Sequence, residues 1–169
     1  MRRGVVKILA VSGAGVAAIF VASLADFAPV IVWNASASAP IGLYRIEQDA
    51  SPEIGDFVLV RPDEVLEKFI ISRGYLPENI PLLKRIAALP GDEICREFEA
   101  IFINEIRVAD AQKLDSKGRK MPSWSGCFRL QSGEIFLLND PENSLDGRYF
   151  GATKSVAVIG VARAVWARG

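Results

Sequence analysis

The sequence predicts a mainly β domain with one minor helix, preceded by an N-terminal membrane segment. Three observations support this fold class: an uncharged apolar run near the start, many short runs rich in Val, Ile and Phe, and a single stretch with helix signals at both ends. A chain of 169 residues with an apolar fraction of 50% suits one globular domain plus a hydrophobic appendage. We therefore expect a membrane segment over residues 1–27 and one domain over residues 28–169.

The N-terminal segment carries the signals of export. Residues 1–7 hold three positive charges and no acid, and the 18 residues from Ile8 to Ala25 are uncharged. This length lies between the core of a signal peptide and a short transmembrane helix, so cleavage and retention as an anchor both remain open. The apolar residues 27–33 favour the anchor. The charge asymmetry keeps the N-terminus inside and exports the chain after Ala25.

The best helix candidate is Pro62 to Arg73, with proline at its start, acids in its first turn and Gly74 after its end. The apolar runs that indicate strands are "DFVLV" at 56, "LLKRIAAL" at 82, "AIFINEIRV" at 100, "EIFLLN" at 134 and "SVAVIGVARAVW" at 155. Turn signals separate them, as in "PGD" at 90. Residues 110–126 are polar and predict a long surface excursion.

Composition excludes several kinds of chemistry. The chain has no histidine, so Ser-His-Asp and Cys-His catalysis are impossible and the commonest zinc ligand is missing. We expect no metal and no cofactor. A net charge of zero gives no electrostatic reason to expect nucleic acid as a partner. Export would place Cys95 and Cys127 in an oxidising compartment, which predicts a disulfide, with two buried thiols as the alternative.

Two clusters could supply a nucleophile and a base. In "SASAP", residues 36–40, the proline restricts the backbone before it, so Ser38 would lie on a defined bend; a plain linker is the alternative. Lys84 lies inside an apolar run, and alternation places it on the same face as Ile86. Burial would lower the pKa of Lys84 and make its neutral amine a general base. The alternative is a lysine that reaches solvent.

A third cluster, "NSLDGRYFG" at 143–151, offers Asp146 and Arg148 two positions apart beside the hydroxyl of Ser144. It could be an ordinary turn with a salt bridge, or a support that fixes a base in position.

Together, "SASAP", "KRIAALPGD" and "NDPENSLDGRYFG" resemble the boxes of the S26 family of membrane-bound serine peptidases, the type I signal peptidases. The resemblance implies a β-rich catalytic domain and a Ser-Lys dyad. Residue by residue, it implies Ser38 as nucleophile, Lys84 as base and Ser144 as the group that orients the lysine. It also implies a salt bridge between Asp146 and Arg148 that supports the same strand as Ser144. The hydroxyl of Ser36 would help the Ser38 backbone N–H to form the oxyanion hole.

The spacing "S.P.GLY" and "SLDGRYFG" resembles the TraF branch, the peptidases of conjugative transfer systems. That branch implies a propilin substrate of a type IV secretion system, head-to-tail cyclisation in some members, and a catalytic domain on the periplasmic side of the inner membrane. Ile41 and Leu43 are candidate walls of the substrate pocket. Three alternatives are weighed against this interpretation: a general signal peptidase for presecretory proteins, a non-catalytic assembly module, and a self-cleaving switch protein.

Overall fold

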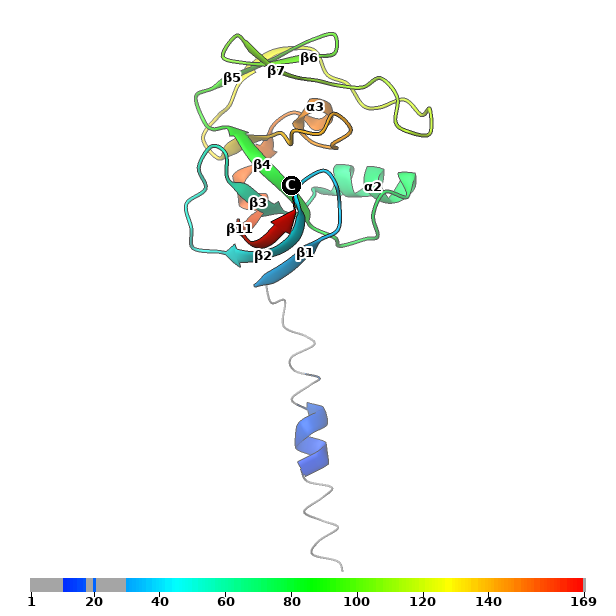
Figure 1. Cartoon of the computed structure of the whole chain (residues 1–169), viewed down its shortest axis with the longest axis vertical. Helices are drawn as coiled ribbons and strands as arrows, with labels where there is room; N and C mark the ends of the chain where they lie inside the picture. Colours follow the sequence, from blue (N-terminus) through cyan, green and yellow to red (C-terminus); the bar gives the residue numbers. More distant parts are fainter. Residues whose placement is uncertain (1–10, 18–19, 21–29, 169) are drawn as a thin grey trace, which may run out of the picture.

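The computed structural model describes residues 11–17, 20 and 30–168 (Figure 1). Residues 11–17 are helical, and within the described ranges no helix is both long enough and apolar enough to cross a membrane. Most of the predicted membrane segment, residues 1–27, lies outside the described residues. The domain predicted over residues 28–169 is described from Val30 to Arg168.

Two antiparallel sheets make up the domain and confirm the mainly β prediction. The larger sheet has seven strands in the order β1-β2-β11-β3-β4-β9-β10, and the smaller has four in the order β7-β6-β5-β8. The bounds in the larger sheet are β1 Ile31–Asn34, β2 Ile41–Glu47, β3 Phe57–Val60, β4 Leu82–Ala88, β9 Glu134–Leu137, β10 Thr153–Lys154 and β11 Val158–Arg168. Those in the smaller sheet are β5 Glu93–Glu97, β6 Ala100–Ile103, β7 Ile106–Asp110 and β8 Gly126–Arg129.

Strand β11 holds the larger sheet together, because it pairs with β2 on one side and with β3 on the other. Two glycines permit this close crossing. A Cβ on Gly42 would meet the carbonyl oxygen of Trp166 at 2.1 Å, and one on Gly160 would meet that of Glu47 at 2.8 Å. Real Cβ atoms do not approach so closely, so any side chain here would push the strands apart.

Helix α2 spans Glu64–Arg73 and begins two residues later than the sequence predicts. The reason is that the Asp63 carboxylate accepts a hydrogen bond of 2.8 Å from the Leu66 N–H and so caps the first turn. Gly74 ends the helix at a φ of 66°, as expected of a C-terminal glycine. The sequence did not predict α3, Gly147–Phe150, nor the 3₁₀ turn Ser155–Ala157 that precedes β11.

The core consists of clusters of buried side chains that join residues far apart in the chain. Val58, Ile86 and Val161, from β3, β4 and β11, pack together with exposed fractions of at most 1%. Strand β4 is thus held by the packing of Ile86 and by pairing with β3 on one side and β9 on the other. This is the strand that carries Lys84.

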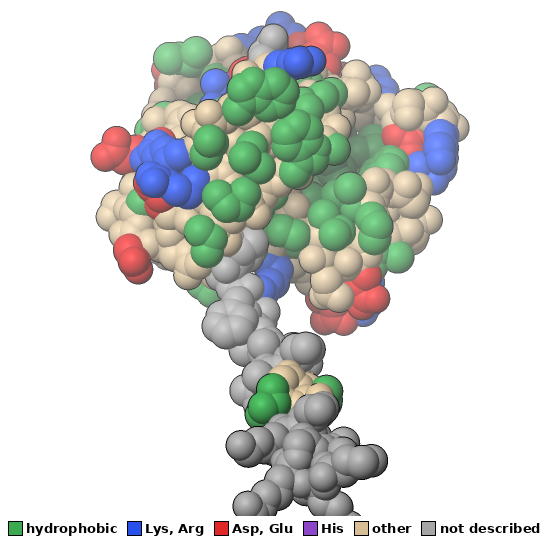
Figure 2. All heavy atoms as spheres, turned by 60° about the horizontal axis from the view of Figure 1, so that its bottom comes forward, with side chains coloured by type: hydrophobic (Ala, Val, Ile, Leu, Met, Phe, Trp, Pro, Cys, Tyr) green, Lys and Arg blue, Asp and Glu red, His purple; other side chains and the backbone are tan. Residues whose placement is uncertain are grey.

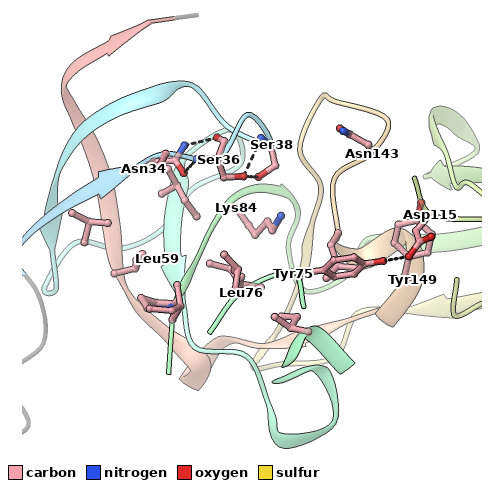
Figure 3. A pocket seen from close by; sticks show the side chains of 18 of the residues that line it. Asn34, Ser36, Ser38, Leu59, Tyr75, Leu76, Lys84, Asp115, Asn143 and Tyr149 are labelled. Atoms are coloured by element: carbon pink, nitrogen blue, oxygen red, sulfur yellow. Dashed lines mark hydrogen bonds between the residues drawn. The ribbon is translucent and has the colours of Figure 1, made fainter. Parts of the chain in front are cut away.

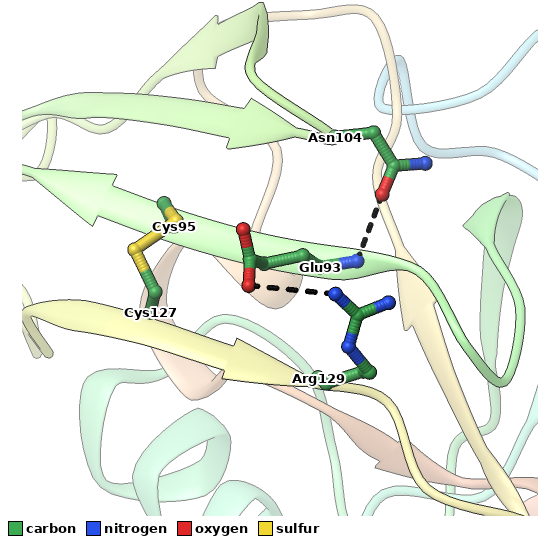
Figure 4. The surroundings of a disulfide bond; sticks show 5 residues. All are labelled: Glu93, Cys95, Asn104, Cys127 and Arg129. Carbon is green, nitrogen blue, oxygen red and sulfur yellow. Dashed lines mark hydrogen bonds and ion pairs between the residues drawn. A yellow bond between two sulfur atoms is a disulfide. The ribbon is translucent and has the colours of Figure 1, made fainter.

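The disulfide predicted from the two cysteines is confirmed (Figure 4). Cys95 of β5 and Cys127 of β8 occupy directly paired positions in the smaller sheet. Two positions along the same strand pair, Glu93 and Arg129 form an ion pair of 3.8 Å. The covalent bond and the ion pair tie β8 to the smaller sheet, although the long segment 111–125 precedes it.

One outer face of β1, β2 and β11 is apolar and exposed. Trp33 and Trp166 stack there with ring centroids 5.9 Å apart, and Leu43 is their paired neighbour on the strand between them. Trp33 is 55% exposed and Trp166 47%. The tryptophan face, as we name it, comprises Ile31, Trp33, Ile41, Leu43 and Trp166. Figure 2 shows hydrophobic side chains gathered on the end of the domain where β1 begins.

Arginines lie around the tryptophan face. Arg168 is paired with Ile41, and its guanidinium lies 4.9 Å from the centroid of the Trp166 ring. Arg45 and Arg163 are paired with each other one step beyond the tryptophans. Arg45 and Arg163 are ion-paired with Glu47, and Arg163 also with Asp56. Arg168 is therefore the arginine that lies directly against the aromatic surface.

Candidate active site

Three segments bring the three sequence clusters to one apolar cavity of about 810 Å³. They are the loop between β1 and β2, strand β4, and the loop that leads from β9 into α3. Ser38 and Lys84 both line the cavity. In Figure 3 the Lys84 side chain lies beneath the loop that carries Ser36 and Ser38, and Asn143 lies across from them.

The loop of Ser38 is fixed by Asn34, a buried residue that the sequence analysis did not single out. The Asn34 amide donates to the carbonyl oxygens of Ser36, Ala39 and Pro40 at 2.9–3.1 Å, and its own oxygen accepts from the Ser36 N–H at 3.0 Å. These four bonds hold the turn from inside. The plain-linker alternative is therefore wrong. The bond from the Ser36 N–H to the Asn34 side-chain oxygen makes an Asx turn, which asparagine favours, so the residue type at position 34 was a signal available in the sequence.

The two serines of this loop contact each other. Ser36 Oγ and Ser38 Oγ are 2.9 Å apart, and the Ser38 N–H donates to Ser36 Oγ at 3.3 Å. Both hydroxyls are exposed to the cavity side rather than packed in the core. The hydroxyl that the sequence assigns to the oxyanion hole thus touches both the oxygen and the N–H of the predicted nucleophile.

Lys84 is 5% exposed, which excludes the alternative of a lysine that reaches solvent. Its ammonium donates a hydrogen bond of 3.1 Å to Ser144 Oγ, and Ser144 is itself fully buried. Burial lowers the pKa of Lys84 from 10.5 to about 8; the negative charge of Asp146 opposes this shift and the positive charge of Arg148 adds to it. A lysine in this state supplies a substantial fraction of neutral amine at neutral to mildly alkaline pH.

Asp146 and Arg148 form a buried ion pair of 3.1 Å beneath the lysine. Asp146 also accepts from the backbone N–H of Arg148, which caps α3. The Arg148 guanidinium donates to the carbonyl oxygen of Asn139, and Arg96 donates to the carbonyl oxygen of Arg148 at 2.6 Å. The segment that carries Ser144 is thus held by charge-assisted bonds on both sides.

The walls of the cavity differ from the expected ones. Ile41 and Leu43 do not line it. They lie on β2 in the tryptophan face, of which only Ile31 and Trp33 also line the cavity. The apolar wall comes from residues of β1, β3, α2 and the chain around β4, including Ile31, Leu59, Ile70, Leu76 and Leu82, and from Met121 in the segment between β7 and β8. Pocket walls contributed by α2 and by residue 121 could not be inferred from a motif, because neither segment is near Ser38 in sequence.

The polar segment predicted as a surface excursion forms the far side of the cavity. Asp115 accepts from the Tyr75 hydroxyl and from Arg119, each at 2.7 Å. Burial alone would raise the pKa of Asp115, but these hydrogen bonds outweigh it and hold the pKa well below its usual range. The charged carboxylate therefore anchors the excursion against the residues that follow α2.

Antiparallel β sheets around an apolar cavity, with a serine loop at its edge and a buried lysine in its wall, suit the class of β-rich serine peptidases. The chain belongs to the signal peptidase family, peptidase S26, whose family model matches residues 3–167.

The chain is similar to two transfer proteins and to one solved structure. It is 31% identical over 170 residues to the plasmid transfer protein TraF of Escherichia coli, covering 94% of each chain. It is 30% identical over 174 residues to the conjugal transfer protein TraF of Agrobacterium fabrum, covering 98% of this chain and 97% of that protein. A signal peptidase I of Enterococcus faecalis aligns at a TM-score of 0.40 and 20% identity, over 66% of this chain and 97% of that one.

Proposed function

We propose that the protein is a membrane-associated serine endopeptidase in which Ser38 is the nucleophile and Lys84 the general base. The observation that carries this proposal is the pair of groups on one cavity: an accessible hydroxyl and a buried amine whose pKa lies near 8. The chain has no histidine to take the proton. A lysine whose neutral form is favoured by burial can take it instead.

In the reaction the lysine accepts and returns a proton twice, once in forming the ester and once in resolving it. Ser38 Oγ attacks the scissile carbonyl carbon while its proton passes to Lys84 Nζ, and the carbonyl oxygen takes the electron pair of the double bond. Collapse of this intermediate breaks the C–N bond, and the leaving amine takes the proton from Lys84. An ester on Ser38 remains, which water or a second amine then attacks, with Lys84 accepting and returning the proton again. Ser144 holds the amine in place through the 3.1 Å bond.

The oxyanion hole forms when the Ser36 hydroxyl rotates. In the structure its oxygen accepts from the Ser38 N–H. When substrate enters, rotation of Ser36 frees this N–H and directs the Ser36 O–H toward the same point, so that two donors face the developing oxyanion. The same rotation breaks the contact between the two hydroxyls and lets Ser38 turn toward Lys84. A donor of this kind contributes about 3–4 kcal/mol to the transition state in other serine hydrolases.

The substrate we propose is the propilin of a conjugative type IV secretion system. Both relatives carry names of plasmid or conjugal transfer, and each is similar over nearly its whole length. The apolar cavity suits a hydrophobic segment near the cut. Cyclisation of the pilin and simple hydrolysis share the Ser38 ester and differ only in whether an amine or water resolves it.

The tryptophan face supports a site next to the membrane. Tryptophan is enriched at membrane–water interfaces, and arginine reaches from such faces to lipid headgroups. The face includes β1, the first strand of the domain, which follows the predicted membrane segment in sequence (Figure 1). We propose that the domain rests on the periplasmic side of the inner membrane.

Intact mass spectrometry of the candidate pilin, co-expressed with the protein, tests this function. Trimming that is lost in Ser38→Ala and in Lys84→Ala supports the dyad. A trimmed pilin lighter by one water means cyclisation, and a linear product means hydrolysis. Trimming of unrelated presecretory proteins would favour a general signal peptidase. An untouched pilin removes the propilin assignment, and trimming that survives Ser38→Ala removes the nucleophile.

A further inference from the structure

One buried side chain joins the strand of Lys84 to the loop of Ser144. Asn139 follows β9, is 2% exposed, and uses all of its polar groups. Its side-chain oxygen accepts from the Arg85 N–H at 2.8 Å, and its side-chain nitrogen donates to the Leu83 carbonyl at 3.2 Å. The two bonded residues are the neighbours of Lys84 on either side.

The side-chain amide of Asn139 makes the hydrogen bonds to β4 that the next main-chain residue of β9 would otherwise make. Strand β9 pairs with β4 up to Leu137, and the last main-chain bond runs from the Leu138 N–H to the Arg85 carbonyl at 2.9 Å. Beyond it the main chain turns away toward Ser144. The Asn139 side chain continues the ladder in its place, so β4 stays paired on that side next to Lys84.

The main chain of Asn139 holds the other half of the site. Its N–H donates to Asp146 at 3.1 Å, and its carbonyl accepts from the Arg148 guanidinium. One residue thus bonds to both neighbours of Lys84 and to both members of the ion pair that borders Ser144. The position of Lys84 relative to Ser144 therefore depends on these four hydrogen bonds, which we call the Asn139 junction.

We propose that Asn139 is a positioning residue, which fixes the Lys84 amine relative to Ser144 and Ser38 through its side-chain bonds to Leu83 and Arg85. This inference rests on the proposed function of Lys84 as base. Only a side chain with one donor and one acceptor at this length makes both bonds. Aspartate keeps the shape but lacks the donor and adds a negative charge beside the buried lysine. Serine removes the two-point contact without adding charge.

Two variants of the full chain in detergent test the role, Asn139→Asp and Asn139→Ser. The matched control is Asn104→Asp: Asn104 also accepts from a backbone N–H, that of Glu93 at 2.9 Å, and donates to Asp92, but at the smaller sheet (Figure 4). The NMR resonances of lysine Cε atoms report the titration of each lysine without any substrate. The resonance that disappears in Lys84→Met is that of Lys84. Pilin cleavage, measured well below each variant's unfolding temperature, gives kcat and KM.

In Asn139→Asp we expect Lys84 to titrate about one pH unit higher, because the added charge joins Asp146 in opposing the effects of burial and Arg148. The neutral amine at pH 7 then falls about tenfold, and kcat falls with it and recovers at higher pH. In Asn139→Ser we expect kcat to fall about ten- to a hundredfold even at pH 9.5, with KM unchanged, because the base is misplaced.

The proposal is overturned if folded Asn139→Ser keeps the wild-type kcat, or if Lys84 titrates in Asn139→Asp as it does in Asn104→Asp. Lower melting temperatures alone would show only a structural contribution. If Asn139→Asp does not fold, the kcat and KM of Asn139→Ser decide. If the wild-type protein leaves the pilin intact, the propilin assignment fails, while the titration of Lys84 still tests the junction.

Discussion

The Lys84 ammonium donates a 3.1 Å hydrogen bond to Ser144 Oγ, and 60 positions of sequence separate the two residues. Both are buried, so the bond cannot be exchanged for one to bulk water. It directs the amine and leaves its lone pair, once deprotonated, available to a neighbouring hydroxyl.

The activity should follow the deprotonation of Lys84. Because only the neutral amine accepts a proton, kcat/KM should rise about tenfold per pH unit below pH 8 and level off above it, in line with the pKa of about 8. A pH–rate profile from 6 to 10 measures this. Asp146→Asn should move the rising part of the profile to lower pH, because the Asp146 carboxylate raises the pKa of Lys84. A flat profile would contradict the role of Lys84.

Lys84→Met should inactivate the protein and stabilise it. The folded state holds Lys84 with a pKa of about 8, against 10.5 when unfolded, so below pH 8 folding is opposed by up to about 3 kcal/mol. Wild-type stability therefore rises between pH 8 and 10.5, where the unfolded chain binds more protons. The advantage of Lys84→Met should shrink over that interval. Urea unfolding of both proteins at pH 7 and pH 10 measures it; an advantage that grows with pH would refute the explanation.

Removing Arg148 should destabilise the domain more than removing both members of its ion pair. Arg148→Met leaves the Asp146 carboxylate buried without its 3.1 Å partner, at a cost of about 3–5 kcal/mol. Asp146→Asn combined with Arg148→Met removes the uncompensated charge and should cost less. Denaturant unfolding at pH 7 compares them. Arg107→Met, which breaks the exposed pair with Asp110, is the control and should change little.

Loss of the disulfide should lower stability without removing the catalytic groups. Cys95 and Cys127 are 32 positions apart, so the bond restricts the unfolded chain by about 3–4 kcal/mol. Cys95→Ala with Cys127→Ala should lower the unfolding temperature and keep cleavage at low temperature, because the cysteines lie in the smaller sheet, away from the cavity. Loss of cleavage by a fully folded variant would show that the two sheets are coupled.

The tryptophan face should contact lipid. The chain has three tryptophans, and Trp124, which donates to the Gly147 carbonyl at 3.1 Å, lies away from this face and provides an internal control. Variants that keep one tryptophan each, reconstituted in vesicles with brominated acyl chains, distinguish the positions. We expect quenching of Trp33 and Trp166 and not of Trp124. Equal quenching of all three would contradict a defined orientation on the bilayer.

Local features of the sequence predicted a large part of this structure. The mainly β class, the region of α2 and the pairing of Cys95 with Cys127 all follow from patterns within a few residues or from composition. The residues that meet around Lys84 were also predictable, because motifs of the family preserve their order. Strand β1 was not predicted because its four residues are too few to show alternation. Strand β2 was missed because the Ser, Ala and Pro before it indicate a loop and its own residues include Gly42, Arg45 and Glu47.

The features that the sequence did not predict depend on registers between distant strands. Leu43 belongs to the outer face because Trp33 and Trp166 are its neighbours on β1 and β11, more than a hundred positions apart. The alternation of residues along β2 alone does not show which face of the sheet is exposed. Likewise, the Asn139 side chain can bond to β4 only because the main chain of β9 separates from β4 just after Leu138. No periodicity in the sequence shows where two paired strands separate.

The place of β11 between β2 and β3 affects when the candidate site can assemble. The loop of Ser38 adjoins β2, and Lys84 lies on β4 beside β3, so the two halves of the site are joined through a strand synthesised after both. During vectorial synthesis the serine loop is made first and the lysine next, but the sheet between them closes only when residues 158–168 arrive. Until then, the Ser38 loop and Lys84 are not held at the one cavity that both line in the folded domain.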